Sequence, residues 1–252
     1  MKKSAKRFLF KIYRILTGLL SWRAPLFFRD YGKFMSLDDG RFSVSALDFY
    51  PCLRDKTRKT NFDAHYVYHT SWAARKVKEI GQSKHVDISS SLYFSGIVSA
   101  FVPVDFYDYR PADLKLSGLK SSHCDLTSLF FTDGSVNSLS CLHTVEHIGL
   151  GRYGDPIDPT GDIKAISELK RVLAPGGSLL FVVPVGRPKV EYNAHRVYSF
   201  EMIHGFFKDL VLQEFSLVTD EGRFVVNADP ELVGQQKYGC GCFLFKKPYD
   251  NC

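Results

Sequence analysis

The sequence predicts an α/β protein with a doubly wound, mostly parallel sheet. Short apolar, β-branched runs alternate along the chain with segments of helical periodicity. The stretch 136–183 contains a complete strand–helix–strand unit with Pro175-Gly176-Gly177 between the helix and the second strand. The chain has 252 residues, of which 45% are hydrophobic, which is enough for one such domain and an appendage.

The strand–helix–strand unit is the best defined part of this pattern. Its strands are expected at 136–142 and 178–183, and the second run is apolar and β-branched, as suits a parallel sheet buried on both faces. Proline cannot continue the helix between them, and glycine tolerates the left-handed turn that follows. The residues that recur at helical spacing are Ile163, Ile166, Leu169, Val172 and Leu173.

The other elements follow the same alternation. A helix over 62–80 is expected to be capped by Thr60 or Asn61 and ended by Gly81. No helical pattern separates the last two strands, so the seventh strand should insert antiparallel. The further strands are predicted at 84–89, 102–107, 122–126, 211–218 and 241–246, and the further helices at 92–101 and 199–207.

The N-terminus differs from the rest of the chain. Residues 1–23 contain seven lysines and arginines, and Lys11 and Arg14 interrupt the apolar run before it could span a membrane. We predict a basic amphipathic helix over 1–23, which either lies on an anionic membrane surface or packs on protein. A signal peptide is less suitable, because 21–25 is a poor cleavage site. Residues 24–60 are expected to be an irregular extension.

Charge and cysteine content exclude several classes of protein. The net charge is +6, but residues 24–252 hold 26 basic and 27 acidic residues, so no nucleic-acid partner is expected. Six cysteines occur at irregular spacings, and Cys240-Gly241-Cys242 is one residue short of a C-x-x-C motif. We therefore expect reduced thiols and no metal site in a cytoplasmic protein, which the helix over 1–23 could associate with a membrane. The sequence leaves the oligomeric state open.

Two longer motifs carry a resemblance to a known family. V-E-H-I at 145–148, followed by L-K-R-V-L-A-P-G-G-S-L-L-F-V-V-P at 169–184, resembles the later half of class I S-adenosylmethionine-dependent methyltransferases. With G-L-G-R-Y-G-D-P-I-D-P at 149–159 and N-A-H-R at 193–196, the chain also resembles a methyltransferase-like family catalogued as a domain of unknown function. This resemblance implies a Rossmann-like seven-stranded sheet with an antiparallel last strand, a methyltransferase-like domain over 61–252, and S-adenosylmethionine as cofactor.

The loop after the first strand is where the resemblance weakens. Asp87 matches the family's acid, but Ser89 and Ser91 occupy the places of its glycines, so the glycine loop is degenerate. Serine is small and donates a hydrogen bond, so the cofactor's amino-acid part still has room there. The alternative is a plain strand-to-helix turn with Ser91 as the N-cap.

Two further acids end neighbouring strands, where doubly wound sheets bind ligands. Asp108 lies 21 residues after Asp87 and is expected to accept the two ribose hydroxyls. The alternatives are that Asp108 pairs with Arg110, or that Asp105 accepts the ribose hydroxyls in its place. Asp125 resembles the family's acid at the adenine amino group.

Leu126 would give apolar contact to the adenine ring, and Thr144 belongs to a stretch that lines the cofactor in the family. In the same stretch, His147 is a candidate base for the acceptor's proton, and Glu146 could orient it. The alternative is that Glu146 caps the following turn while His147 packs on the sheet.

The acceptor is expected at two polar loops. Residues 149–161 form a Gly-, Pro- and Asp-rich loop that is longer than a tight connection requires, and Arg152 and Tyr153 are its candidate ligands. Asn193, His195 and Arg196 follow the fifth strand, and His195 is a second candidate base. Residues 62–66 are a candidate cover for this site.

Two functions remain open from the sequence. The first is methyl transfer to a small-molecule or saccharide acceptor, which requires positioning of the reactants and no nucleophile. The second is a catalytically inactive methyltransferase-like protein that binds or scaffolds, which the serines at 89 and 91 favour. A nicotinamide dehydrogenase would need G-x-G-x-x-G after the first strand, and this motif is absent.

Overall fold

The computed structural model describes residues 13 and 20–249. The chain divides into two compact units, residues 1–61 and 62–252, and each is described separately. Most of the predicted helix over 1–23 lies outside the described residues, and residues 21–23 form a bend and a turn. No helix among the described residues is both long and apolar enough to cross a membrane.

The N-terminal unit contains a helix that the sequence analysis did not predict. Residues 24–60 were expected to be irregular, but helix α2 (Ala24–Leu37) and the 3₁₀ turn η1 (Ala46–Asp48) form within them. Phe27 and Tyr31 lie one helical turn apart, and their rings contact Phe49 at centroid distances of 5.2 and 4.9 Å. The apolar face of α2 thus packs against Phe49, the residue that follows η1.

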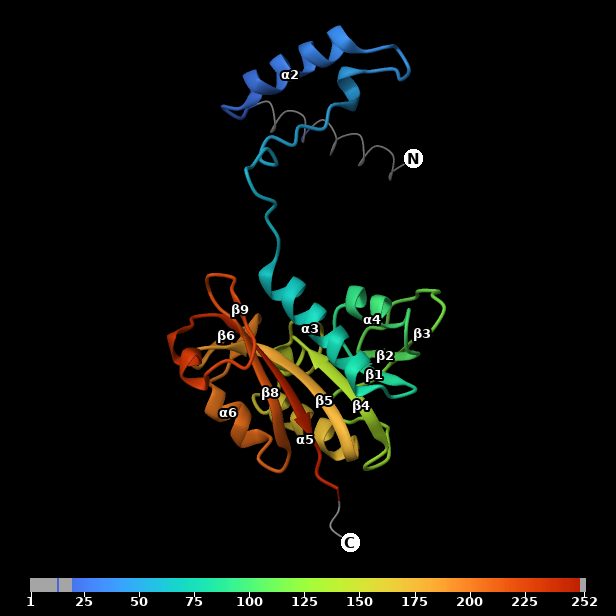
Figure 1. Cartoon of the computed structure of the whole chain (residues 1–252), viewed down its shortest axis with the longest axis vertical. Helices are drawn as coiled ribbons and strands as arrows, with labels where there is room; N and C mark the ends of the chain where they lie inside the picture. The colour runs from blue at the N-terminus through green and yellow to red at the C-terminus, as the bar shows by residue number, and fades with distance from the viewer. Residues whose placement is uncertain (1–12, 14–19, 250–252) are drawn as a thin grey trace. The chain divides into compact units, whose positions relative to one another are not determined.

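In the C-terminal unit, the strands of the main sheet are β1 His85–Ile88, β2 Val104–Asp108, β3 Leu119–His123, β4 Val136–Leu142, β5 Leu173–Val185, β8 Val211–Val218, β9 Phe224–Val225 and β10 Gly239–Lys246. Their order is β3-β2-β1-β4-β5-β10-β8-β9 (Figure 1). Strands β1 to β5 pair in parallel, and β10 pairs antiparallel with β5 and β8. The predicted doubly wound sheet with an antiparallel late strand is confirmed.

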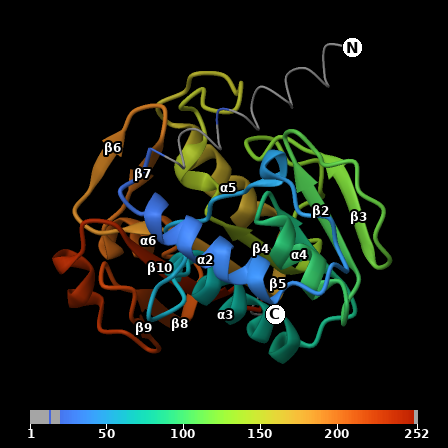
Figure 2. The same cartoon turned by 90° about the horizontal axis from the view of Figure 1, so that it is seen from above.

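Helices cover both faces of the sheet. Their bounds are α3 Ala64–Ile80, α4 Leu92–Val98, α5 Gly161–Val172 and α6 Phe200–Phe206. Trp72 of α3 and Phe94 of α4 belong to the core on one face, whereas Leu169 of α5 and Ile203 of α6 belong to the core on the other. Figure 2 shows α3 and α5 on opposite sides of the strands. Each fully buried aliphatic side chain of this kind contributes about 1.5–3 kcal/mol.

Several predicted boundaries were wrong. The described part of the main sheet has eight strands instead of seven, because β9 adds a short antiparallel edge next to β8. The third strand was expected at 122–126 but ends at His123, so Asp125 and Leu126 lie in the loop after it. The connection between β8 and β10 also contains a 3₁₀ helix, η3 (Pro230–Gln235), with Asp229 as its N-cap.

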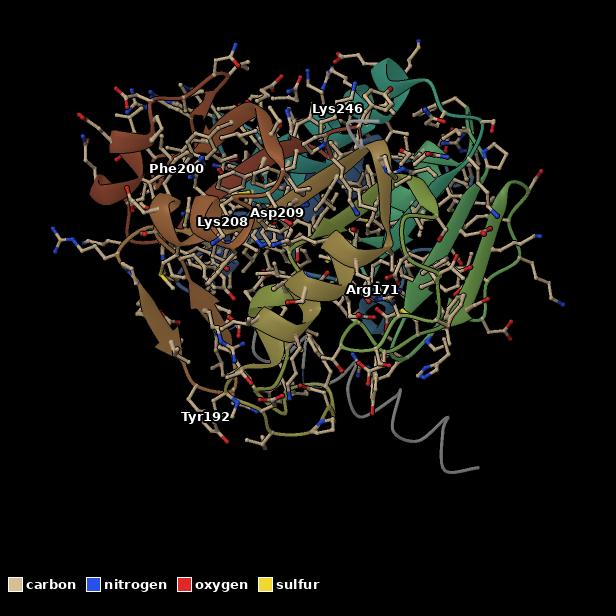
Figure 3. The ribbon with its side chains drawn as sticks, turned by 90° about the horizontal axis from the view of Figure 1, so that it is seen from below. Arg171, Tyr192, Phe200, Lys208, Asp209 and Lys246 are labelled. Atoms are coloured by element: carbon tan, nitrogen blue, oxygen red, sulfur yellow. The ribbon has the colours of Figure 1, made fainter. Side chains whose placement is uncertain are left out.

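A separate hairpin was also not predicted. Strands β6 (Lys189–Glu191) and β7 (His195–Val197) pair antiparallel beside the carboxyl end of β5. Asn193 adopts a positive φ of 61° in the tight turn between them. Tyr192 of this turn points away from the body of the protein (Figure 3) and is 73% exposed. Three-residue strands are too short to give a recognisable alternation in the sequence.

Candidate functional site

A cavity of about 400 Å³ lies where the parallel strands β1 to β4 end. This is the edge at which doubly wound sheets bind ligands. Three loops that are far apart in the sequence contribute to it. The predicted cofactor residues that line it are Ser89, Ser91, Asp108, Asp125, Leu126 and Thr144.

The loop after β1 has the backbone shape of a glycine turn. Ser89 adopts a φ of 55°, in the left-handed region that glycine occupies without cost. Its carbonyl accepts a hydrogen bond of 2.9 Å from the Thr144 hydroxyl, and its amide donates to the Tyr107 carbonyl at 2.7 Å. Ser91 is the N-cap residue of α4, but its side chain makes no capping bond. The two neighbouring strands therefore hold this loop in place.

Asp87 does not contact the cavity, which corrects its predicted role as a cofactor ligand. Its carboxyl is fully buried and accepts hydrogen bonds from the hydroxyls of Ser90 and Ser140, both at 2.5 Å, and from Ser95. Burial raises the pKa of Asp87 to about 6 although the three hydroxyls favour the charged form. Asp87 thus supports the loop from below.

Asp108 is placed to accept hydrogen bonds from a ligand. Its Oδ1 accepts the Arg110 amide at 2.7 Å, which leaves Oδ2 without a partner among the described residues. The Arg110 guanidinium lies over the Tyr153 ring, 4.6 Å from its centroid, so it does not pair with Asp108. The alternative residue, Asp105, forms an ion pair with Lys84. The geometry therefore favours Asp108 over Asp105.

Asp125 stabilises its own loop and still faces the cavity. Its Oδ1 accepts the amide and the hydroxyl of Thr127 at 2.8 and 2.7 Å. This turn orients the carboxylate, an acceptor-only group that suits an amino group on a ligand. Leu126 beside it is buried and gives the same part of the cavity an apolar wall.

A second, more polar cavity adjoins the first. Tyr66, His143, His147 and Tyr153 line both of them. Four of the predicted acceptor residues, Arg152, Tyr153, Asn193 and His195, line this second cavity. Of the predicted cover over 62–66, the residues Asp63, His65 and Tyr66 line the second cavity.

Arg196 does not line either cavity, so its prediction as an acceptor ligand was wrong. Its side chain is buried and its Nη1 donates to the Ile148 carbonyl at 2.6 Å. Its Nη2 donates to the Pro159 carbonyl at 3.3 Å, and its Nε lies 3.5 Å from Asp162 Oδ2. Because Ile148 and Pro159 flank the acceptor loop, Arg196 holds the two ends of that loop together.

His147 has one nitrogen engaged and one free. Its Nδ1 donates to the Ala194 carbonyl at 2.6 Å, which fixes the neutral tautomer with an unprotonated Nε2. Burial lowers the pKa of His147, so the ring is neutral near pH 7. Its Nε2 is 3.7 Å from Glu146 Oε1. Glu146 does not cap the following turn with its Oε1, because this oxygen faces the His143 ring nitrogen at 2.8 Å.

A group of side chains around the second cavity was not predicted as a unit from the sequence. His143 has a positive φ of 54° at the end of β4, which turns its ring toward α3. Burial raises the pKa of Glu146 to about 7 and lowers that of His143 to about 4. These residues are distant in sequence from the others in the group, so no spacing motif indicates it. The others are His65, His69 and Tyr238.

The strand order, the helices on both faces and a cavity at the carboxyl ends of β1 to β4 are those of a class I methyltransferase-like fold. More narrowly, residues 128–216 match the family described as "Caenorhabditis protein of unknown function, DUF268". This segment contains the two motifs at 145–148 and 169–184. None of the curated proteins matches the chain.

Solved structures show the same fold at low sequence identity. The N-methyltransferase NodS from Bradyrhizobium japonicum WM9, in complex with S-adenosyl-L-homocysteine, is 15% identical, with a TM-score of 0.54 over 77% of this chain and 93% of NodS. A sarcosine dimethylglycine methyltransferase from Galdieria sulphuraria, named as putative, is 14% identical, with a TM-score of 0.52 over 72% and 86%. The [4+2]-cyclase SpnF is 13% identical, with a TM-score of 0.50 over 71% and 80%. These likenesses concern the fold, which hosts more than one reaction.

Proposed function

We propose that this protein binds S-adenosylmethionine in the first cavity and transfers its methyl group to a polar small-molecule or saccharide acceptor in the second. The observation that carries the proposal is that the two cavities share His143 and His147 at their junction. A cofactor and an acceptor could therefore meet there. Methyl transfer of this kind is an in-line displacement, in which the protein mainly aligns two reactants.

The residues of the first cavity fit this cofactor. The left-handed turn at Ser89 brings backbone close to the space that the amino-acid part would occupy. The free oxygen of Asp108 would accept the ribose hydroxyls, and Asp125 with Leu126 would hold the adenine. The Ser89 hydroxyl donates to the Tyr107 carbonyl at 3.2 Å, whereas the Ser91 hydroxyl remains as a donor for a carboxylate. The fit rests on groups from three adjacent strand ends.

The cofactor supplies a methyl group on a positively charged sulfur. The acceptor heteroatom attacks this carbon, and its proton must leave as the new bond forms. His147 Nε2, which is unprotonated, is the atom we assign to take that proton. Glu146 lies beside it at 3.7 Å and would stabilise the imidazolium that results. His195 is the second candidate, because its Nε2 is buried without a hydrogen-bond partner among the described residues.

The lining of the second cavity favours a polar acceptor. Arg152 donates to the Ala194 carbonyl at 3.2 Å and is exposed, so its other N–H groups are accessible to a ligand. Tyr66, Tyr153 and Tyr238 offer ring faces, and Asn193 offers an amide. Aromatic rings with scattered hydrogen-bonding groups suit sugar rings better than apolar substrates.

Calorimetric titration with S-adenosylmethionine and S-adenosylhomocysteine tests the cofactor assignment. Asp108→Ala should weaken both affinities about 10- to 100-fold, because two hydrogen bonds to a charged acceptor are lost. Asp105→Ala is the matched control, since Asp105 lies on the same strand but pairs with Lys84. Its affinity should stay within about twofold of the wild type.

The outcomes separate the two candidate functions. Equal affinities in the Asp108 and Asp105 variants would remove the ribose assignment. No binding of either compound to the folded wild-type protein would favour the inactive binding or scaffold protein, for which the serines of the β1 loop are the specific argument. Binding followed by methylation of a pooled sugar and small-molecule library, detected by mass spectrometry, would support methyl transfer directly.

A further inference from the structure

A group of potential metal ligands lies beside the second cavity. One ring nitrogen each of His65 and His143 and the Sγ of Cys240 lie within 4.8 Å of one another. The three residues come from α3, from the loop after β4 and from β10. Ligands of a tetrahedral zinc ion are separated by about 3.3–3.6 Å, so small side-chain rotations would close the site. Two imidazoles and a thiolate are ligand types that zinc prefers.

The hydrogen bonds around His143 orient it as a ligand. Its Nδ1 and Glu146 Oε1 are 2.8 Å apart, an arrangement in which a carboxylate accepts from the ring and leaves Nε2 with a lone pair. Nε2 is buried and has no hydrogen-bond partner among the described residues. Carboxylates in this position commonly fix the tautomer of metal-binding histidines.

Buried polar atoms without hydrogen-bond partners are concentrated in the same place. Five buried side-chain atoms among the described residues lack a hydrogen-bond partner, and four of them belong to this cluster or its edge. His69 Nδ1 donates to the His65 carbonyl at 2.7 Å, so its Nε2 is also an acceptor. Its ring lies 4.9 Å from that of His143. The four atoms are His69 Nε2, His143 Nε2, Glu146 Oε2 and His195 Nε2.

Several buried polar atoms without hydrogen-bond partners need a cation or water beside them. We propose that His65, His143 and Cys240 bind a divalent transition-metal ion, with zinc as the best match, and that Glu146 positions His143. The proton of the Cys240 thiol passes to solvent when the metal binds. With three protein ligands, a bound ion would keep a fourth coordination position for water or a ligand, and His65 and His143 also line the second cavity.

Metal titration of the purified full-length protein tests this proposal. After treatment with a chelator and its removal, the protein should bind one equivalent of Zn²⁺. Co²⁺ in its place should give the near-ultraviolet absorption that marks a thiolate–cobalt bond. Cys240→Ser should abolish this band and weaken Zn²⁺ binding by more than about 100-fold, a larger loss than the removal of an outer-shell partner causes.

Cys242→Ser is the matched control, because Cys242 is two residues further along β10, is equally buried and lies outside the ligand group. It should keep both the band and the affinity. Glu146→Gln should keep the band and weaken Zn²⁺ binding about 10- to 100-fold, as loss of an orienting partner does. His65→Gln, at the half-exposed first turn of α3, tests the site even where Cys240→Ser fails to fold.

Three results would overturn the proposal. These are a cobalt spectrum without a thiolate band, equal behaviour of the Cys240 and Cys242 variants, and Zn²⁺ affinity unchanged by His65→Gln. Metal binding does not depend on the proposed methyl transfer. Calorimetry with S-adenosylhomocysteine on the same variants therefore separates failure of the metal site from failure of the cofactor site.

Discussion

At the scale of single residues, the cofactor loop depends on a polar network buried beneath it. His85 lies between the hydroxyls of Ser138 and Ser140, each 2.8 Å from a ring nitrogen, and Ser140 donates to Asp87. Burial lowers the pKa of His85 to about 3, so the ring is neutral. A Ser90 hydroxyl that donates to Asp87 also accepts the Leu142 amide at 3.1 Å. The network therefore joins β1 to β4 below the loop.

The pKa of Asp87 predicts how stability depends on pH. In the folded protein it is about 6, above the unfolded value of about 4, so the folded state holds this proton more tightly. This stabilisation is complete below about pH 4 and is lost as the pH rises through 6, by roughly 3 kcal/mol. Asp87→Asn removes the titration. Thermal melts between pH 4 and 7 should show the wild type losing stability relative to the variant, whereas parallel curves would contradict the assignment.

At the scale of elements, the hairpin β6–β7 shapes the acceptor cavity through both its turn and its inner strand. Ala194 in the turn accepts from His147 and Arg152, and the Asn193 amide donates to the Leu150 carbonyl at 3.3 Å. Arg196 on β7 fixes the ends of the loop over 149–161 from below. One short hairpin thus positions a candidate base and the acceptor loop together.

Substitution of Arg196 should separate this structural role from substrate binding. Arg196→Met leaves the buried carboxylate of Asp162 without its cation, which should destabilise the protein by about 3–5 kcal/mol. Arg152→Met, on the exposed side of the same loop, should cost less than about 1 kcal/mol. Denaturant unfolding of both variants measures the difference. Equal stabilities would return Arg196 to the list of candidate acceptor ligands.

At the scale of the whole molecule, every residue that lines the two cavities lies within 62–252. Both hydrophobic cores also belong to this unit. The N-terminal unit has its own contacts, including a hydrogen bond of 2.8 Å from the Arg23 guanidinium to the Leu53 carbonyl. The described residues of the two units therefore fold around separate sets of contacts.

A chain of residues 62–252 should fold cooperatively and bind S-adenosylhomocysteine with an affinity within about threefold of the full-length protein. The physical reason is that truncation removes no side chain from either core or from the cavities. Thermal unfolding and calorimetry on both chains provide the measurement. A truncated protein that does not fold would show that residues 1–61 complete the C-terminal unit.

Much of the fold was predictable because its signals are local. The strands at 136–142 and 211–218 were predicted with their observed bounds from their apolar residues, although both also contain polar ones. Helix α2 was missed although its apolar residues recur at helical spacing, and its packing partner Phe49 is distant in sequence. Strands β6, β7 and β9 were missed because two or three residues give no periodicity.

The candidate site was likewise predictable only in part from the sequence. The sequence determined the class of fold, the strand ends and hence the loops with Ser89, Asp108 and Asp125, because the order of elements and the residues that follow each strand are written along the chain. Only the tertiary structure decided that Asp87 and Arg196 are buried supports, since burial depends on what packs around a side chain. It also decided that His65, His143 and Cys240 meet. Their proximity arises from sheet order and helix packing, and no spacing in the sequence encodes it.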